Sequence, residues 1–199
     1  MSDISPQLVR ELRDKTNAGM MDCKRALAEA GGDLAKAEDL LRAKGIASAG
    51  KKASRSAKEG IVASYIHLQG KVGVLVEVNC ETDFVAKNDN FREFVKDITL
   101  HIAAANPTCV SREQVDPSEI ERERAIYRQQ VEGKPANIVE KIVEGKVDKF
   151  YGTICLMEQP FIKNPDVSIA DLVKSKITEL GENIVIRRFT RYAVGEEAA

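Results

Sequence analysis

Tryptophan is absent from the sequence, and aromatic residues make up only 5% of it. The four cysteines are widely separated, without a Cys-x-x-Cys pair or a neighbouring pair of histidines, so a metal site has little support. In a reducing compartment we expect four free thiols, mostly small buried side chains: Cys23, Cys80, Cys109 and Cys155. The only two histidines, His67 and His101, fall on a predicted strand and a predicted helix, where packing or surface positions are the simpler interpretation.

The sequence motifs of nucleotide-binding and hydrolytic enzymes are also missing. We find no phosphate-binding loop, dinucleotide fingerprint, nucleophile elbow or zinc-protease motif, so an enzyme with its own chemistry is poorly supported. The 30 basic and 31 acidic residues leave a net charge of −1, which favours neither nucleic acid nor a membrane as the partner. No apolar run approaches the about 20 residues that span a bilayer, and the first residues do not form a signal peptide, so we expect a cytoplasmic protein.

Residues 1–46 are predicted to fold as three short helices. Ser5 begins the first helix, the pair Gly31-Gly32 ends the second, and Asp33 caps the third, which we expect to end at Gly45. A three-helix bundle of this size has a thin core. Such bundles are typical of docking modules.

Two adjacent methionines, Met20 and Met21, begin the second predicted helix. Neighbouring residues on a helix lie about 100° apart, so both cannot face the core of the bundle. We expect at least one to be exposed, where a flexible thioether suits an adaptable contact surface. A position at the edge of the bundle is the open alternative.

Residues 47–60 are rich in alanine, serine and lysine and lack large apolar side chains, which predicts a linker between two domains. The second domain, residues 61–195, begins with a predicted β-hairpin. Its strands, Ile61–Leu68 and Lys71–Asn79, flank a Gln69-Gly70 turn. One face of the second strand should be buried, because it carries Val72, Val74, Val76 and Val78.

A predicted helix from about Asn88 to Ala105 should cover this valine face. Its apolar stripe consists of Phe91, Phe94, Val95, Ile98 and Ile102. Residues from about 117 to 150 are predicted to form a projecting hairpin of two antiparallel helices, because both helices have narrow apolar stripes. Asp116 is a predicted cap for the first of them, and Gly145 can interrupt the second.

Ile169–Leu180 is predicted as a further helix and Asn183–Tyr192 as a strand that can join the sheet. Residues 196–199 are predicted to form a disordered tail. The fold class is therefore α+β. It combines an N-terminal three-helix bundle, similar to ubiquitin-associated modules, with a linker and a small antiparallel sheet that is packed with helices and carries a projecting helical hairpin.

The most unusual stretch is Asn79–Ala86, where a predicted strand ends in Thr-Asp-Phe. It places the carboxylate of Asp83 and the ring of Phe84 at an exposed strand-to-helix corner, from which the ring could enter a crevice of a partner. The alternative is a helix cap by Thr82 or Asp83, with Phe84 folded back onto the hairpin. Spacing alone favours the capping interpretation, because caps of this type are common.

Two long motifs resemble the signatures of the translation elongation factor Ts family. The first is Leu12–Leu27, with the sequence LRDKTNAGMMDCKRAL, and the second is Val76–Lys87, with the sequence VEVNCETDFVAK. The resemblance continues through Gly133–Pro135 and Gln159–Phe161, so it covers nearly the whole chain. Two long motifs in the right order are a highly specific signal.

The resemblance implies guanine-nucleotide exchange on elongation factor Tu, in its GDP-bound and nucleotide-free forms. The residues that would contact this partner are Arg13, Met20, Met21, Thr82, Asp83, Phe84 and Val85. Asp83 and Phe84 would intrude beside the nucleotide and disturb the elements that hold Mg²⁺. The resemblance therefore favours an exposed Phe84 ring that enters the partner over a ring folded back onto the hairpin. A factor of this kind is not an enzyme and needs no cofactor, and we expect no direct contact with nucleic acid or a membrane.

The resemblance also bears on assembly. Longer members of the family carry two related halves of the core domain, whereas this chain has room for one. Short members are expected to restore the missing half by pairing with a second copy, which predicts a homodimer. The edge strand Ile184–Tyr192 is a natural place for that contact.

Three other interpretations stay open. The chain could be a generic interaction adaptor whose N-terminal bundle is its binding site, and it would then leave nucleotide release unchanged. It could bind RNA through the basic linker and Arg187, Arg188 and Arg191, with an affinity that falls steeply with salt. A thiol enzyme that uses Cys80 has the least support, and Cys80→Ser would separate this reading from a packing role.

Overall fold

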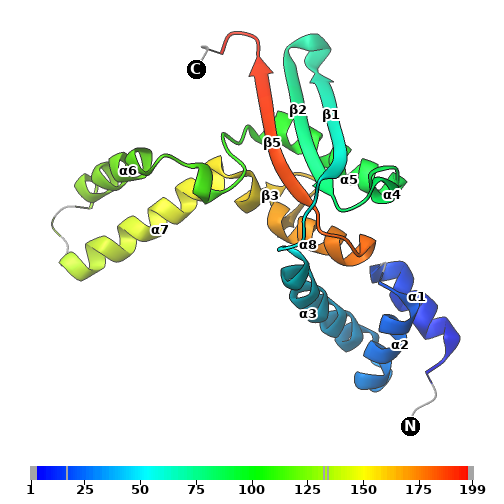
Figure 1. Ribbon diagram of the computed structural model, residues 1–199. Coiled ribbons are helices and arrows are strands. Elements are labelled where there is room, and N and C mark those ends of the chain that lie inside the picture. The colour runs from blue at the N-terminus through cyan, green and yellow to red at the C-terminus, as the bar shows by residue number, and fades with distance from the viewer. Residues whose placement is uncertain (1–3, 17, 132, 134, 197–199) are drawn as a thin grey trace. The chain divides into compact units, whose positions relative to one another are not determined.

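The structure is a computed structural model that describes residues 4–16, 18–131, 133 and 135–196. It is α+β, as predicted (Figure 1). Its helices are α1 (Pro6–Thr16), α2 (Met20–Glu29), α3 (Leu34–Lys52), α4 (Asp83–Ala86), α5 (Asp89–Ala105), α6 (Pro117–Gln129), α7 (Ala136–Ile154) and α8 (Ile169–Leu180). Its strands are β1 (Glu59–His67), β2 (Val72–Cys80), β3 (Pro160–Phe161), β4 (Asn164–Ser168) and β5 (Val185–Ala193). Within the predicted tail, residues 197–199 lie outside the described residues.

The chain divides into two compact units, each made of segments that are not consecutive in sequence. The first unit contains Met1–Ile61, Asn79–Phe94 and Asp171–Val185. The second unit contains Val62–Val78, Val95–Ala170 and Ile186–Ala199. The first unit therefore combines the N-terminal helices with the segment that follows β2. The predicted division into residues 1–46, 47–60 and 61–195 follows chain order and stays a prediction.

The N-terminal helices pack on one another as a three-helix bundle, because α1, α2 and α3 each contact the other two. Their shared core consists of Val9, Leu12, Ala18, Cys23, Ala26, Leu27 and Ala37. The predicted cap of α3 is confirmed, since the side chain of Asp33 accepts a hydrogen bond from the backbone N–H of Lys36 at 3.1 Å. The likeness to ubiquitin-associated modules stays a prediction.

The end of α3 was predicted wrongly. The helix continues through Gly45 to Lys52, so it includes the first part of the predicted linker. A glycine costs a helix only about 1 kcal/mol relative to alanine, and here tertiary contacts oppose that cost. The Thr178 hydroxyl donates to the Gly45 carbonyl at 3.1 Å, and Ala49 is buried.

The main sheet has the strand order β1-β2-β5, so β2 is the central strand and β5 an edge strand (Figure 1). The predicted valine face of β2 is buried, and so is the predicted stripe of α5. At the end of α5, the Ala103 carbonyl accepts a hydrogen bond from Arg191 Nε of β5 at 3.4 Å. The helix therefore ends beside the sheet that its stripe was predicted to cover.

The connections around the sheet differ from the prediction in two places. Between β1 and β2, a 3₁₀ turn over Leu68–Gly70 replaces the two-residue Gln69-Gly70 turn. Leu68 and Gln69 have φ of 50° and 56°, a conformation that residues with side chains rarely adopt and that sequence motifs therefore do not signal. The short antiparallel pair β3-β4 was also missed, because its strands are too short for a pattern of alternating residues.

The helical hairpin is formed by α6 and α7, which lie side by side (Figure 1). The Asp116 side chain accepts from the Ser118 N–H at 2.8 Å, which confirms the predicted cap. Gly145 does not interrupt α7, which continues to Ile154, because buried residues on both sides of it pack in the same small core. That core consists of Ile120, Val131, Val143 and Val147.

His101 is a buried polar residue of the second unit. Its Nδ1 accepts from the Ile162 N–H at 3.3 Å, so Nε2 carries the proton and donates to Gln159 Oε1 at 3.0 Å. Burial lowers the pKa of His101 below its ordinary value of 6.5. The side chain is therefore a neutral core histidine, as the packing interpretation predicted.

This burial predicts how stability depends on pH. As the pH falls below about 6.5, the unfolded chain binds a proton at His101 and the folded chain does not, so the folded state loses stability. The free energy of unfolding in urea should fall between about pH 7 and about pH 5. The slope should be smaller in His101→Gln and should persist in His67→Gln, which leaves His101 in place. An unchanged slope in His101→Gln would contradict this origin.

Candidate functional site

The candidate site begins where β2 ends, at the corner Thr82–Val85. Thr82 has extended backbone (φ −130°, ψ 156°), and its hydroxyl accepts from the Val85 N–H at 3.4 Å. Thr82 is therefore the N-cap of α4, as one interpretation of the sequence predicted. The ring of Phe84 does not fold back onto the hairpin, because the residue is 81% exposed. Capping and exposure of the ring thus occur together.

Asp83 is the first residue of α4 and also points to solvent. Its Oδ2 accepts a hydrogen bond from Lys87 Nζ at 2.7 Å, which together with the charge of Lys87 lowers the pKa of Asp83. Asp83 is therefore an anion at neutral pH. Both side chains of this ion pair are more than half exposed, so the pair contributes little to stability. The corner presents an apolar ring beside a negative charge.

Two residues from the far end of the chain contact this corner or Glu81, the residue before it, and the sequence analysis missed both. Glu182 accepts hydrogen bonds from the backbone N–H groups of Glu81 and Thr82, each at 3.0 Å. The backbone N–H of Asn183 donates to Glu81 Oε1 at 2.6 Å. Both residues lie about a hundred positions from the corner, and no local pattern connects them to it.

The N-terminal part of the candidate site is Arg13, Met20 and Met21, which we call the N-terminal surface. Met20 is 52% and Met21 66% exposed, so both methionines lie outside the bundle core. Arg13 is exposed on α1. The N-terminal surface and the corner belong to the same compact unit. Their role in binding stays a prediction.

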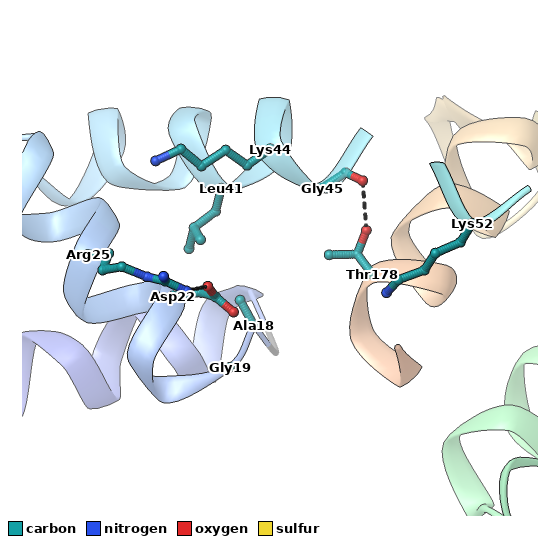
Figure 2. Close-up of a pocket in the computed structure, with 9 residues that line it drawn as sticks. All are labelled: Ala18, Gly19, Asp22, Arg25, Leu41, Lys44, Gly45, Lys52 and Thr178. Carbon is teal, nitrogen blue, oxygen red and sulfur yellow. Dashed lines mark hydrogen bonds and ion pairs between the residues drawn. The ribbon is translucent and has the colours of Figure 1, made fainter. Parts of the chain in front are cut away.

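A hollow of about 420 Å³ lies between α2, α3 and α8 in the first unit (Figure 2). Its described lining is Ala18, Gly19, Asp22, Arg25, Leu41, Lys44, Gly45, Lys52 and Thr178. Figure 2 shows the Thr178–Gly45 hydrogen bond at one side of it. Arg25 is paired with Asp22 at 2.5 Å and Lys44 with Glu29, so two of its three basic side chains are neutralised by neighbouring carboxylates. None of the predicted site residues contributes to the described lining.

The four cysteines are free thiols, as predicted. Cys80 lies next to the corner, where it donates to the Thr82 carbonyl at 3.1 Å, and burial raises its pKa to about 11. A thiol that stays protonated at neutral pH is a poor nucleophile, so the geometry gives no support to the thiol-enzyme reading.

Among the described residues, no three His, Cys, Asp or Glu side chains are grouped as ligands for a metal ion. Within the same part of the chain, no helix is long and apolar enough to cross a membrane.

The described residues form an α+β fold with an exposed ring and a carboxylate at the corner, and comparison with known sequences shows the family of the chain. The family described as Elongation factor TS matches residues 48–196. The elongation factor Ts of Alkaliphilus oremlandii is 60% identical over 98% of this chain and 90% of its own length. That of Carboxydothermus hydrogenoformans is 59% identical over 98% and 91%, and that of Nitratidesulfovibrio vulgaris 57% over 98% and 99%. The chain belongs to the elongation factor Ts family, and its role lies in translation elongation.

Proposed function

We propose that this protein binds elongation factor Tu and promotes the release of GDP from it. The observation that carries the proposal is Phe84, a large ring that is 81% exposed on a helix turn whose N-cap is hydrogen-bonded. An aromatic ring exposed to water does not stabilise the folded chain, whereas the same ring can be buried in an apolar crevice of a partner. Asp83 brings a negative charge to the same place.

The mechanism is linkage between two binding events. Mg²⁺ and the surrounding phosphate-binding backbone supply much of the hold of a GTPase on its nucleotide. A protein that binds best when those contacts are broken must weaken nucleotide binding, and the nucleotide must weaken its binding by the same factor. No covalent bond forms and no cofactor takes part, so the protein acts as an exchange factor and not as an enzyme. Because the partner works in translation, the place of action is the cytoplasm.

The N-terminal surface provides a second contact with the partner. Met20 and Met21 are both exposed, and flexible thioethers adapt to an irregular partner surface. Arg13 adds a positive charge on the neighbouring helix. Contact at the N-terminal surface would hold the complex together while the corner acts on the nucleotide site.

The first test measures the release of fluorescent GDP from purified elongation factor Tu. Wild-type protein should accelerate release, and Asp83→Ala/Phe84→Ala should slow the accelerated rate at least about tenfold, equivalent to about 1.4 kcal/mol. Binding should persist, because the N-terminal surface is intact. The control Asp39→Ala/Ile162→Ala, which removes an acid and an apolar side chain elsewhere, should keep the wild-type rate.

Other results would redirect the proposal. Acceleration that survives in the corner variant would keep the exchange function and move its cause to the N-terminal surface. Binding without acceleration by the wild-type protein would favour the adaptor reading. The RNA-binding reading would gain support from RNA affinity that falls steeply with salt. Arg55, a basic side chain of the predicted linker that RNA would contact, lies 3.6 Å from Glu81, so its charge is partly neutralised.

We also propose that the protein works as a homodimer. Gly73 and Leu75 alternate with the buried valines of β2, so they lie on the opposite face of the sheet. Ile66 lies close to Gly73 on this face, and Arg188 pairs with Glu77 there at 2.8 Å. The exposed apolar side chains of this outer sheet face are Val62, Ile66, Leu75 and Tyr192, which are 49% to 73% exposed. A second copy of the chain, facing it with the same surface, would cover these side chains.

Sedimentation velocity at several concentrations tests the dimer. Wild-type protein should sediment as a dimer and Leu75→Glu as a monomer. A symmetric contact would bury the introduced carboxylate close to the same carboxylate of the second chain. Ile138→Glu replaces a similarly exposed apolar residue on α7 and should remain dimeric. A monomeric wild-type protein, or a fully dimeric Leu75→Glu, would overturn the proposal.

A further inference from the structure

The polar contacts around the corner converge on the carboxylate of Glu182, which lies between α8 and β5. Its Oε2 accepts from the backbone N–H groups of Glu81 and Thr82, each at 3.0 Å. Its Oε1 accepts from the Thr82 hydroxyl at 2.6 Å. Hydrogen bonds to a charged acceptor are shorter and about twice as strong as those between neutral groups. One side chain thus satisfies three donors, two on Thr82 and one on Glu81, the residue before the corner.

These contacts determine how Thr82 caps α4. The Thr82 hydroxyl has one hydrogen, which it donates to Glu182, and this leaves its lone pairs free to accept from the Val85 N–H at 3.4 Å. Because α4 has only four residues, it cannot persist by its own backbone hydrogen bonds. The orientation of Phe84 therefore depends on a cap that Glu182 orients.

Asn183 extends this network to the segment after α3. Its Nδ2 donates to the carbonyls of Ala53 at 3.2 Å and Arg55 at 2.8 Å, and its backbone N–H donates to Glu81. The side chain is buried, so these bonds are shielded from water. The dipeptide Glu182-Asn183 thus connects the corner to the segment that follows the N-terminal bundle.

We propose that Glu182 is a positioning residue for nucleotide exchange: it holds Thr82 so that Asp83 and Phe84 are presented in the orientation that acts on the partner. The inference rests on the proposed exchange function. Glu182 itself acts through Thr82 and needs no contact with the partner. A preoriented corner loses little conformational entropy when it binds.

The test compares Glu182→Gln with wild type in GDP release from elongation factor Tu, over a range of factor concentrations. Glutamine keeps the size of the side chain, but it is neutral and its NH₂ group cannot accept a hydrogen bond, so it cannot accept from all three donors and the bonds that remain lose the charge of their acceptor. The maximal release rate at saturation should fall about tenfold, while the concentration for half-maximal effect changes less than about threefold. Mere loss of folded protein would instead raise the apparent half-maximal concentration. Glu93→Gln, an exposed glutamate of the same unit, is the matched control and should behave as wild type.

Amide hydrogen exchange supplies the second measurement. The N–H groups of Glu81 and Thr82 should exchange at least about tenfold faster in Glu182→Gln than in wild type. If Glu182→Gln fails to fold, Thr82→Val removes the same hydroxyl contact from the other side and should lower the maximal rate similarly.

Two results would overturn the inference alone, with the wild-type protein active in the same assay. One is a wild-type maximal rate in Glu182→Gln, and the other is a reduced rate with both amides still protected. A wild-type protein that leaves GDP release unchanged would instead overturn the proposed function, and the role of Glu182 with it.

Discussion

The carboxylate of Glu182 is the contact on which the arrangement of the corner depends. A strand that ends in an exposed aromatic ring has no core to hold that ring, so its orientation must come from the backbone around it. Glu182 supplies three hydrogen bonds to this backbone and to the Thr82 cap. These hydrogen bonds orient the exposed Phe84 ring and the Asp83 carboxylate. The same carboxylate therefore relates the fold of the chain to its proposed action on a nucleotide site.

The parts of the fold that local chemistry determines could be predicted from the sequence. Alternating valines identified the buried face of β2, and residues at helical spacing identified the buried stripe of α5. Asp33 and Asp116 were predicted as caps and act as caps. Spacing alone favoured a cap with Phe84 folded back onto the hairpin, and the exposed ring became the favoured interpretation only through the resemblance of the surrounding motif to a known family.

The remaining features depend on residues far apart in the sequence, and no local pattern reports them. Glu182 is one of 31 acidic residues, and nothing near it distinguishes it from a solvated surface charge. The extension of α3 beyond Gly45 involves a hydrogen bond from Thr178, which lies more than a hundred residues away. The first unit combines three separate segments, so its composition follows from tertiary contacts and not from chain order.

The central claim is that the protein and GDP weaken each other's binding to elongation factor Tu. Titration calorimetry can measure the affinity of elongation factor Tu for GDP with and without saturating protein, and its affinity for the protein with and without GDP. The account predicts that the two affinities fall by the same large factor, because linkage is reciprocal. Affinities that do not depend on the other ligand would contradict it and would leave a protein that binds elongation factor Tu without acting on its nucleotide.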